Sequence, residues 1–123
     1  MMRARRDGLV VHIASWAGRH VLRMPGLAYT AAKHGLVALS ESINVAECVH
    51  GIRSCCICPA DVATPVLGAR PVPAPEEERA RMLQVRDLAA AVLFVAGMPA
   101  SVCTNEILIS PTWNRFYTDR QAP

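Results

Sequence analysis

Three apolar runs, separated by segments of mixed polarity, predict three buried strands along the chain. They are Leu9–Ile13 (LVVHI), Ile52–Cys58 (IRSCCIC) and Asn105–Ser110 (NEILIS). The first two runs lack a clean alternation of apolar and polar residues, which is typical of strands covered on both faces in a parallel sheet. Pro59 is expected to end the second strand, because proline has no backbone N–H to donate.

Helices are predicted between these strands. From Ala28 to His50 the chain has no proline, and apolar residues recur every three or four positions, which predicts an amphipathic helix that Gly51 ends. The segment Asp87–Ala96 (DLAAAVLFVA) predicts a second, strongly apolar helix. A short helix is expected from Glu76, since acidic residues favour the positive end of the helix dipole.

The order strand, helix, strand, helix, strand predicts an α/β fold with a Rossmann-like, three-layer parallel sheet and right-handed crossovers. The length of 123 residues is typical of one domain. Four prolines, at positions 65, 71, 73 and 75, predict that residues 60–74 form a loop without a regular helix. Residues 113–123 are polar with isolated aromatic residues, and we expect them to form a flexible tail.

Composition fits this prediction and argues against two classes of partner. Hydrophobic residues make up 52% of the chain and charged residues 19%, which suits elements buried on more than one face. The net charge is +3, and the three arginines near the start are too few for a nucleic-acid-binding surface. No apolar run reaches the length of a membrane span, and the start lacks the apolar stretch of a signal peptide. We therefore expect no nucleic-acid or membrane partner, and a cytoplasmic protein.

The five cysteines do not predict a metal site. They lie at positions 48, 55, 56, 58 and 103, without the paired two-residue spacing of a zinc site. Three of them fall in the predicted second strand, and we interpret these as small buried hydrophobic residues. The four histidines have no matching carboxylate or thiol spacing, so no metal ligand is predicted.

The motif Y-T-A-A-K, residues 29–33, places a phenol and an amine one helical turn apart. An ammonium close to a phenol favours the phenolate, so Tyr29 beside Lys33 is suited to exchanging a proton with an alcohol or a forming alkoxide. Ser15 follows the first strand, where loops after parallel strands build ligand sites, and could hold a carbonyl oxygen. The spacing alone is weak evidence, because many helices carry a surface tyrosine and lysine by chance.

The ordered set of motifs resembles the second half of the classical short-chain dehydrogenase/reductase family. The resemblance is carried by GLVVHIASWAGR, PGLAYTAAKHGLVALSESI, ICPADVATP, RDLAAAVLFVA and NEILISPT, which cover nearly all of residues 7–112. It implies reversible hydride transfer between NAD or NADP and a small carbonyl or alcohol. The implied roles are carbonyl polarisation by Ser15, acid/base chemistry by Tyr29, and support of the phenolate and the nicotinamide ribose by Lys33.

The resemblance also implies where the nicotinamide and the substrate lie. Pro59, Ala60, Val62 and Thr64 match the segment beneath the nicotinamide, with the Val62 backbone and the Thr64 hydroxyl near its carboxamide. Ala60 replaces a glycine usual in the family, which would crowd the backbone if the position needs a positive φ. Trp16 is expected either to line the substrate entrance or to pack internally.

The glycine-rich turn that holds the cofactor diphosphate has no counterpart in these 123 residues. None of the seven glycines forms G-x-x-x-G-x-G or G-x-G-x-x-G. We therefore expect residues 1–123 to be the C-terminal catalytic portion of a Rossmann domain whose N-terminal dinucleotide-binding half is missing, and to be weakly active or inactive alone. The first strand is then expected to become a sheet edge.

Two other interpretations stay open. One is a non-catalytic fragment or pseudo-enzyme that pairs with a full-length homologue through the helix from Tyr29 to His50, or that forms a homo-oligomer. The other is that Met1 is an internal methionine of a longer reading frame. Neither the substrate nor the preference for NAD or NADP can be predicted from the sequence.

Overall fold

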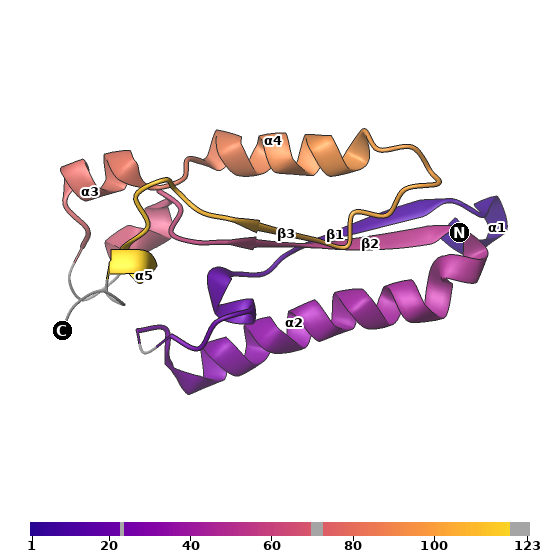
Figure 1. Ribbon diagram of the computed structural model, residues 1–123, viewed down its shortest axis with the longest axis horizontal. Helices are drawn as coiled ribbons and strands as arrows, with labels where there is room; N and C mark the ends of the chain where they lie inside the picture. Colours follow the sequence, from indigo (N-terminus) through magenta and orange to yellow (C-terminus); the bar gives the residue numbers. More distant parts are fainter. Residues whose placement is uncertain (23, 70–72, 119–123) are drawn as a thin grey trace.

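A computed structural model describes residues 1–22, 24–69 and 73–118. Its centre is a parallel sheet of three strands in the order β1-β2-β3: β1 (Gly8–Ile13), β2 (Ile52–Pro59) and β3 (Glu106–Ile109). The long helix α2 (Gly26–Glu47) covers one face of the sheet and α4 (Val85–Ala96) covers the other, as Figure 1 shows. This is the three-layer α/β architecture that the sequence predicts.

The middle strand forms two cores because both of its faces are covered. Cys56 and Cys58 pack with Ala14 and Val37 on the side of α2. The alternate residues Cys55 and Ile57 pack with Val95 on the side of α4. Inward burial on both faces explains why the apolar run of β2 shows no polar alternation.

The helix ends differ from the predicted ones by a few residues. Helix α2 begins at Gly26, two residues before the predicted Ala28, and a 3₁₀ turn, η2 (Cys48–His50), continues it to Gly51. Gly51 closes that turn with a positive φ of 72°, as its glycine predicts. Helix α4 begins at Val85 rather than Asp87, because Gln84 and Asp87 form a capping box in which the Asp87 carboxylate accepts from the Gln84 N–H at 2.7 Å.

The proline-rich loop contains a helix that the sequence prediction excluded. A 3₁₀ helix, η3 (Pro65–Ala69), begins at the first of the four prolines, and Pro71 lies outside the described residues. The prediction of an entirely irregular loop was wrong, because proline is well suited to the first position of a helix, where no N–H is needed. The short helix predicted from Glu76 is confirmed as α3 (Glu76–Arg81).

Both ends of the described chain hold short helices. Helix α1 (Met2–Arg5) was not predicted, and Arg3 joins it to the end of α2 through Glu47, with 2.8 Å between Arg3 Nε and the carboxylate. Helix α5 (Arg115–Thr118) lies within the segment predicted to be a flexible tail. Residues 119–123 of that predicted tail lie outside the described part of the chain.

Strand β1 forms one edge of the sheet. Within the described ranges it pairs only with β2, in register from Gly8 opposite Ile52 to Ile13 opposite Ile57. The last residue of the strand, Ile13, has 43% of its surface exposed. An apolar strand with one open edge is a surface on which another strand can pair.

None of the helices in the described residues is both long enough and apolar enough to cross a membrane.

The three cysteines of β2 are buried thiols, as predicted. Burial raises the pKa of Cys55 to about 11 and that of Cys58 to about 12, from an ordinary value of 9.0, and raises the pKa of Cys56 as well. In contrast, Cys48 is an exposed free thiol at the end of α2. Since the thiolate is the reactive form, the exposed Cys48 thiol should react much faster than the three buried thiols of β2.

Alkylation with iodoacetamide should therefore label Cys48 in the native protein and leave Cys55, Cys56 and Cys58 unlabelled until the chain unfolds. The free energy of unfolding should also fall as the pH rises from about 9 towards 12, because raised folded-state pKa values contribute stability only while the unfolded thiols stay protonated. Mass spectrometry after timed labelling measures the first effect and denaturant titration the second. Rapid labelling of Cys55 or Cys58 in folded protein would contradict the buried sheet.

Candidate active site

A cavity of about 700 Å³ lies where the strands end and the chain enters η1 (Trp16–Gly18), α2 and the segment after β2. Seven of the eight residues predicted for the site border it: Ser15, Trp16, Tyr29, Pro59, Ala60, Val62 and Thr64. The eighth, Lys33, lies one turn beyond Tyr29 on α2 and does not border the cavity. Residues far apart in the sequence thus meet at the carboxyl edge of a parallel sheet, where ligand sites of this architecture lie.

Ser15 is held at this edge by the end of β1. The Ala14 N–H continues the sheet by donating to the Ile57 carbonyl at 2.8 Å, and Ser15 then adopts an extended conformation as the N-cap of η1. Its Oγ accepts a hydrogen bond from the Ala17 N–H at 3.1 Å. Because this bond uses a lone pair, the Ser15 hydroxyl proton stays available for a ligand oxygen.

Tyr29 and Lys33 form a pair in the first two turns of α2. The Lys33 Nζ lies 5.5 Å from the centre of the Tyr29 ring and donates to the Ile13 carbonyl, 3.4 Å away. Tyr29 has 44% of its surface exposed, on the cavity side. The ammonium therefore links the end of β1 to α2 and supports the tyrosine that faces the cavity.

Gly18, the last residue of η1, fixes the distance between η1 and α2. A Cβ added to Gly18 would lie 2.9 Å from the Lys33 carbonyl oxygen and 3.0 Å from a Val37 methyl carbon. Both separations are shorter than normal van der Waals contact, so only glycine permits this approach. The close packing sets the helix that carries Tyr29 and Lys33 against the turn that carries Ser15.

The segment after β2 borders the cavity and is held by a bridge between Val62 and Leu83. Val62 lies opposite Leu83 in an isolated β-bridge, whose two hydrogen bonds are made by the residues on either side of Val62. The Leu83 N–H donates to the Asp61 carbonyl at 3.1 Å, and the Ala63 N–H donates to the Leu83 carbonyl at 2.8 Å. Because successive residues of an extended backbone alternate in direction, the N–H and C=O of Val62 point away from Leu83. No other backbone group within the described residues bonds to them.

Ala60 fits the backbone without strain. It is buried, with 8% of its surface exposed, and its N–H donates to the Ile109 carbonyl at 2.9 Å. The positive φ angles of the described chain are at Arg6, Gly26 and Gly51. The crowding considered for an alanine in place of glycine therefore does not arise at this position.

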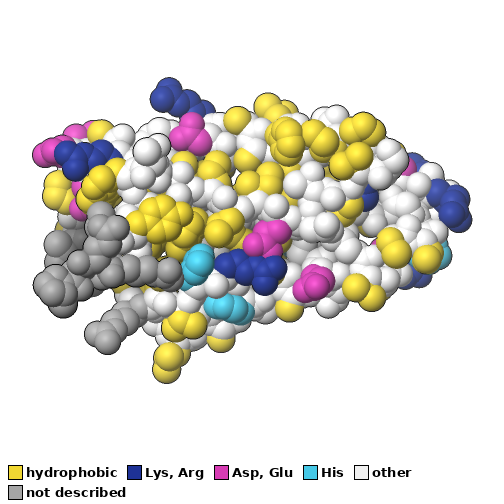
Figure 2. All heavy atoms as spheres, viewed as in Figure 1, with side chains coloured by type: hydrophobic (Ala, Val, Ile, Leu, Met, Phe, Trp, Pro, Cys, Tyr) yellow, Lys and Arg dark blue, Asp and Glu magenta, His cyan; other side chains and the backbone are white. Residues whose placement is uncertain are grey.

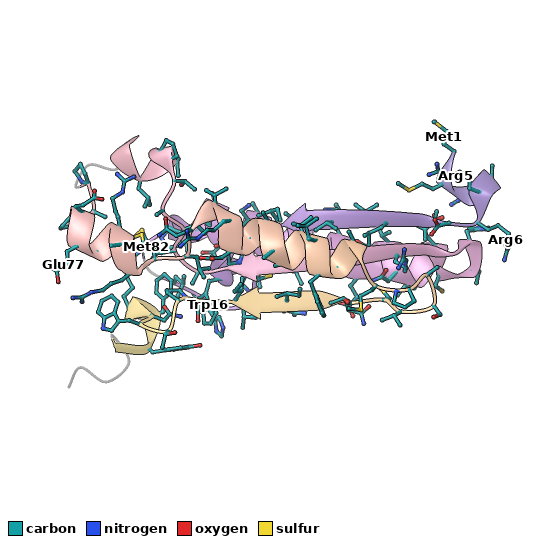
Figure 3. The ribbon with its side chains drawn as sticks, turned by 90° about the horizontal axis from the view of Figure 1, so that it is seen from above. Met1, Arg5, Arg6, Trp16, Glu77 and Met82 are labelled. Carbon is teal, nitrogen blue, oxygen red and sulfur yellow. The ribbon has the colours of Figure 1, made fainter. Side chains whose placement is uncertain are left out.

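Trp16 packs internally, as one of the two expectations has it, and it also borders the cavity. It has 5% of its surface exposed and stacks on His20 and Phe116, with ring centres 4.8 and 6.5 Å away. In Figure 3, Trp16 is labelled beside α5, at the end of the sheet where the strand arrows point. The contact with α5 was not predicted, because 100 positions separate Trp16 from Phe116 in the sequence.

An ion pair ties α5 to the segment after β2. Arg115 contacts the Asp61 carboxylate through Nε at 2.5 Å and through a second guanidinium nitrogen at 2.9 Å. Only 12% of the Asp61 side chain and 25% of the Arg115 side chain are exposed, and such bidentate pairs fix geometry well. Sequence patterns gave no signal for this pair, whose members are 54 positions apart.

No group of three potential metal ligands occurs among the described residues. The polar side chains at the cavity are instead the hydroxyls of Ser15 and Thr64, the Tyr29 phenol and the ion-paired Asp61 carboxylate, and the hydroxyl groups suit an organic ligand with oxygen atoms.

Comparisons with known proteins show the family of this chain. The model of the short chain dehydrogenase family matches residues 1–72. This chain belongs to the short-chain dehydrogenase family. It is 32% identical over 113 residues to farnesol dehydrogenase of Aedes aegypti, covering 89% of this chain and 44% of that protein. It is 31% identical over 114 residues to human dehydrogenase/reductase SDR family member 11, covering 86% of this chain and 44% of that protein.

Solved short-chain dehydrogenase structures share the fold. A crystal structure of an oxidoreductase of this family from Burkholderia thailandensis superposes with a TM-score of 0.78 and 27% identity, over 98% of this chain and 51% of that one. Levodione reductase superposes with a TM-score of 0.74 and 28% identity, over 89% of this chain and 47% of that one. The chain thus spans about half the length of the short-chain dehydrogenases that it matches.

Proposed function

We propose that this chain carries the substrate half of an NAD- or NADP-dependent oxidoreductase site, with Ser15, Tyr29 and Lys33 as its catalytic residues. The observation that carries the proposal is the meeting of Ser15, Tyr29 and the Pro59–Thr64 segment around one cavity. Short-chain dehydrogenases generally use NAD(P) and act on small molecules. The relative from Aedes aegypti is named for an alcohol, farnesol, which supports an alcohol or the matching carbonyl as substrate class.

The residues present fit the nicotinamide end of the cofactor. The Val62 N–H and C=O point away from the Leu83 bridge and offer a donor and an acceptor, which matches the two polar groups of a carboxamide. Pro59, Ala60 and Thr64 border the same cavity and would hold the ring with an apolar surface and a hydroxyl. When bound, the nicotinamide supplies hydride transfer chemistry, which no protein side chain provides.

The chain's own residues would hold the substrate oxygen and move its proton. During alcohol oxidation the Tyr29 oxygen would accept the hydroxyl proton, and the hydrogen on the alcohol carbon would leave as hydride to the bound nicotinamide, so that a carbonyl would form. The Ser15 hydroxyl donates to the substrate oxygen and orients it. Lys33 lies beside the Tyr29 ring and donates to the Ile13 carbonyl, which holds an ammonium group next to the tyrosine. Reduction runs through the same groups in reverse.

A coupled absorbance assay tests the proposal. The purified chain is incubated with NADPH or NADH and a methyl ketone, and oxidation of the nicotinamide is followed together with formation of the alcohol. We expect slow, saturable turnover, since the 123 residues contain no glycine-rich diphosphate turn. Turnover that survives replacement of Ser15 by Ala at an unchanged rate would contradict the proposed roles.

A second candidate function, pairing through α2, is favoured by the surface of that helix. Leu27, Val45 and Val49 are 91%, 78% and 67% exposed and recur at helical spacing along one side of α2 and η2. Gly35 and Ala38 lie between them on the same side and are exposed, which would allow close approach of another helix. Figure 2 shows several separate hydrophobic groups along α2, at the lower edge of the view, with other side chains between them. The proposed partner is a second copy of this chain or a full-length homologue.

Replacing Val45 with Glu should weaken such association at least about tenfold, because a charge would then lie in an apolar contact. Sedimentation velocity over a range of protein concentrations measures the effect. Leu93→Glu on α4, where Leu93 is 71% exposed, is the matched control and should leave association unchanged. Loss of association in the control alone would assign the contact to α4 instead.

A further inference from the structure

The cavity is bordered by a few polar side chains and by a larger number of apolar ones. Its polar side chains are Ser15, Tyr29, Asp61 and Thr64. A different group of bordering residues, which we call the apolar wall, consists of Trp16, Leu22, Met24 and Phe116. The Pro59–Thr64 segment is assigned to the cofactor in the proposed function, so the apolar wall is part of the surface left for the substrate.

The described residues that border the cavity include no lysine, arginine or histidine. Asp61 is the one charged side chain among them, and its carboxylate is ion-paired with Arg115. Among the described bordering residues, none offers a cation that would replace the water lost by a substrate carboxylate or phosphate, and such a loss is unfavourable. The charge pattern argues against an anionic substrate.

Two residues of the apolar wall, Trp16 and Phe116, are held in place by contacts with their neighbours. Phe116 follows Arg115, which Asp61 fixes at 2.5 Å, and its ring stacks on Trp16 with 15° between the planes. Trp16 is itself backed by His20 at 4.8 Å and, edge-on, by Tyr117 at 5.8 Å. Two locked aromatic rings offer a flat apolar surface at little entropic cost.

We infer that this site takes an uncharged carbonyl or alcohol with an extended apolar chain or ring, whose oxygen lies between Ser15 and Tyr29 and whose apolar part packs on Trp16 and Phe116. The inference rests on the proposed function, because it assigns the substrate class of the same site. Phe116 is then a specificity-determining residue, and the Asp61–Arg115 ion pair positions it. Each methylene buried against the wall should tighten binding about fourfold.

Ligand binding tests the inference without requiring turnover. The chain has two tryptophans, and Trp113 is exposed and does not border the cavity, so Trp113→Phe leaves Trp16 as the reporter of the cavity. Methyl ketones of five, seven and nine carbons are titrated against this variant and compared with 4-oxopentanoate, a five-carbon ketone that carries a carboxylate. We expect Trp16 fluorescence to report saturable binding that tightens with length, and weaker binding of 4-oxopentanoate than of the neutral five-carbon ketone.

Two further variants assign the binding to the wall. Phe116→Ala should raise the Kd of the nine-carbon ketone about tenfold, whereas Phe94→Ala, the same change on exposed α4, should leave it unchanged. Calorimetric titration of the unaltered chain with the same ketones gives the same comparison if Trp113→Phe fails to fold.

Binding that does not depend on length, equal or tighter binding of 4-oxopentanoate, or an unchanged Kd in Phe116→Ala would overturn the inference. Failure of the proposed function is a different result: no cofactor binding and no turnover, with length-dependent ketone binding preserved. Conversely, cofactor binding without any ketone binding would contradict the proposed apolar substrate class and would still support the proposed nicotinamide site.

Discussion

Replacing Tyr29 with Phe should lower the rate of nicotinamide-dependent turnover about a thousandfold, the scale of a positioned acid/base group. The substitution removes one oxygen atom from a side chain at the cavity and keeps the ring that lies 5.5 Å from Lys33. The fold should therefore be unchanged while the group that exchanges the substrate proton is lost. Initial rates with a neutral ketone, normalised to folded protein, measure the effect.

Tyr117→Phe is the matched control, since the chain has two tyrosines and this one does not border the cavity. Its ring keeps the edge-on contact with Trp16, so the rate should stay within about twofold of the unaltered chain. A Tyr29→Phe variant that turns over as fast as Tyr117→Phe would exclude Tyr29 as the acid/base. If α2 pairing is the only function, Tyr29→Phe should leave that pairing intact.

Replacing Gly51 with Ala should reduce the free energy of unfolding by about 3 kcal/mol. Gly51 has a φ of 72°, a conformation that side chains of L-residues rarely adopt. A Cβ there would also lie 2.2 Å from the Arg6 carbonyl oxygen, a backbone atom that cannot move aside without shifting the start of β1. Both the turn after α2 and the first strand of the sheet would be strained. Chemical denaturation followed by circular dichroism gives the change.

Gly35→Ala provides the comparison for Gly51→Ala. Gly35 lies within α2, and a Cβ there meets nothing within 4 Å. Alanine in a helix interior is favoured over glycine, so this variant should be as stable as the unaltered chain or more stable by up to about 1 kcal/mol. A Gly51→Ala variant as stable as Gly35→Ala would contradict the observed turn.

The architecture could be predicted from the sequence because the signals for it are local. The apolar runs of β1 and β2 predict strands, and the periodic spacing in α2 predicts a helix. Each of these patterns can be recognised within a window of about a dozen residues. Signals of the same kind were too weak for α1, which has four residues, and for the start of α4, whose cap is Gln84 rather than serine or threonine. Helix η3 was not predicted, because the pattern of prolines was interpreted only as interrupting a helix and not as starting one.

The candidate site could be predicted in part, for a related reason. Ser15, Tyr29 and the Pro59–Thr64 segment follow strands or open a helix, so topology alone brings them to one edge of the sheet. Contacts between residues far apart in the sequence have no local sequence pattern from which they could be predicted. Examples are the ion pair of Asp61 with Arg115 and the close approach of Gly18 to α2. The roles of the predicted residues stay predictions until they are tested by substitution.

The central claim is that the nicotinamide end of the site is formed by these 123 residues. Titration of the purified chain with NADPH and with NADH, following nicotinamide fluorescence, tests it most directly. We predict saturable binding of at least one of them with a Kd below roughly 100 µM, about 5.5 kcal/mol of binding free energy. The absence of saturable binding by both would contradict the claim and leave pairing through α2 as the function to pursue.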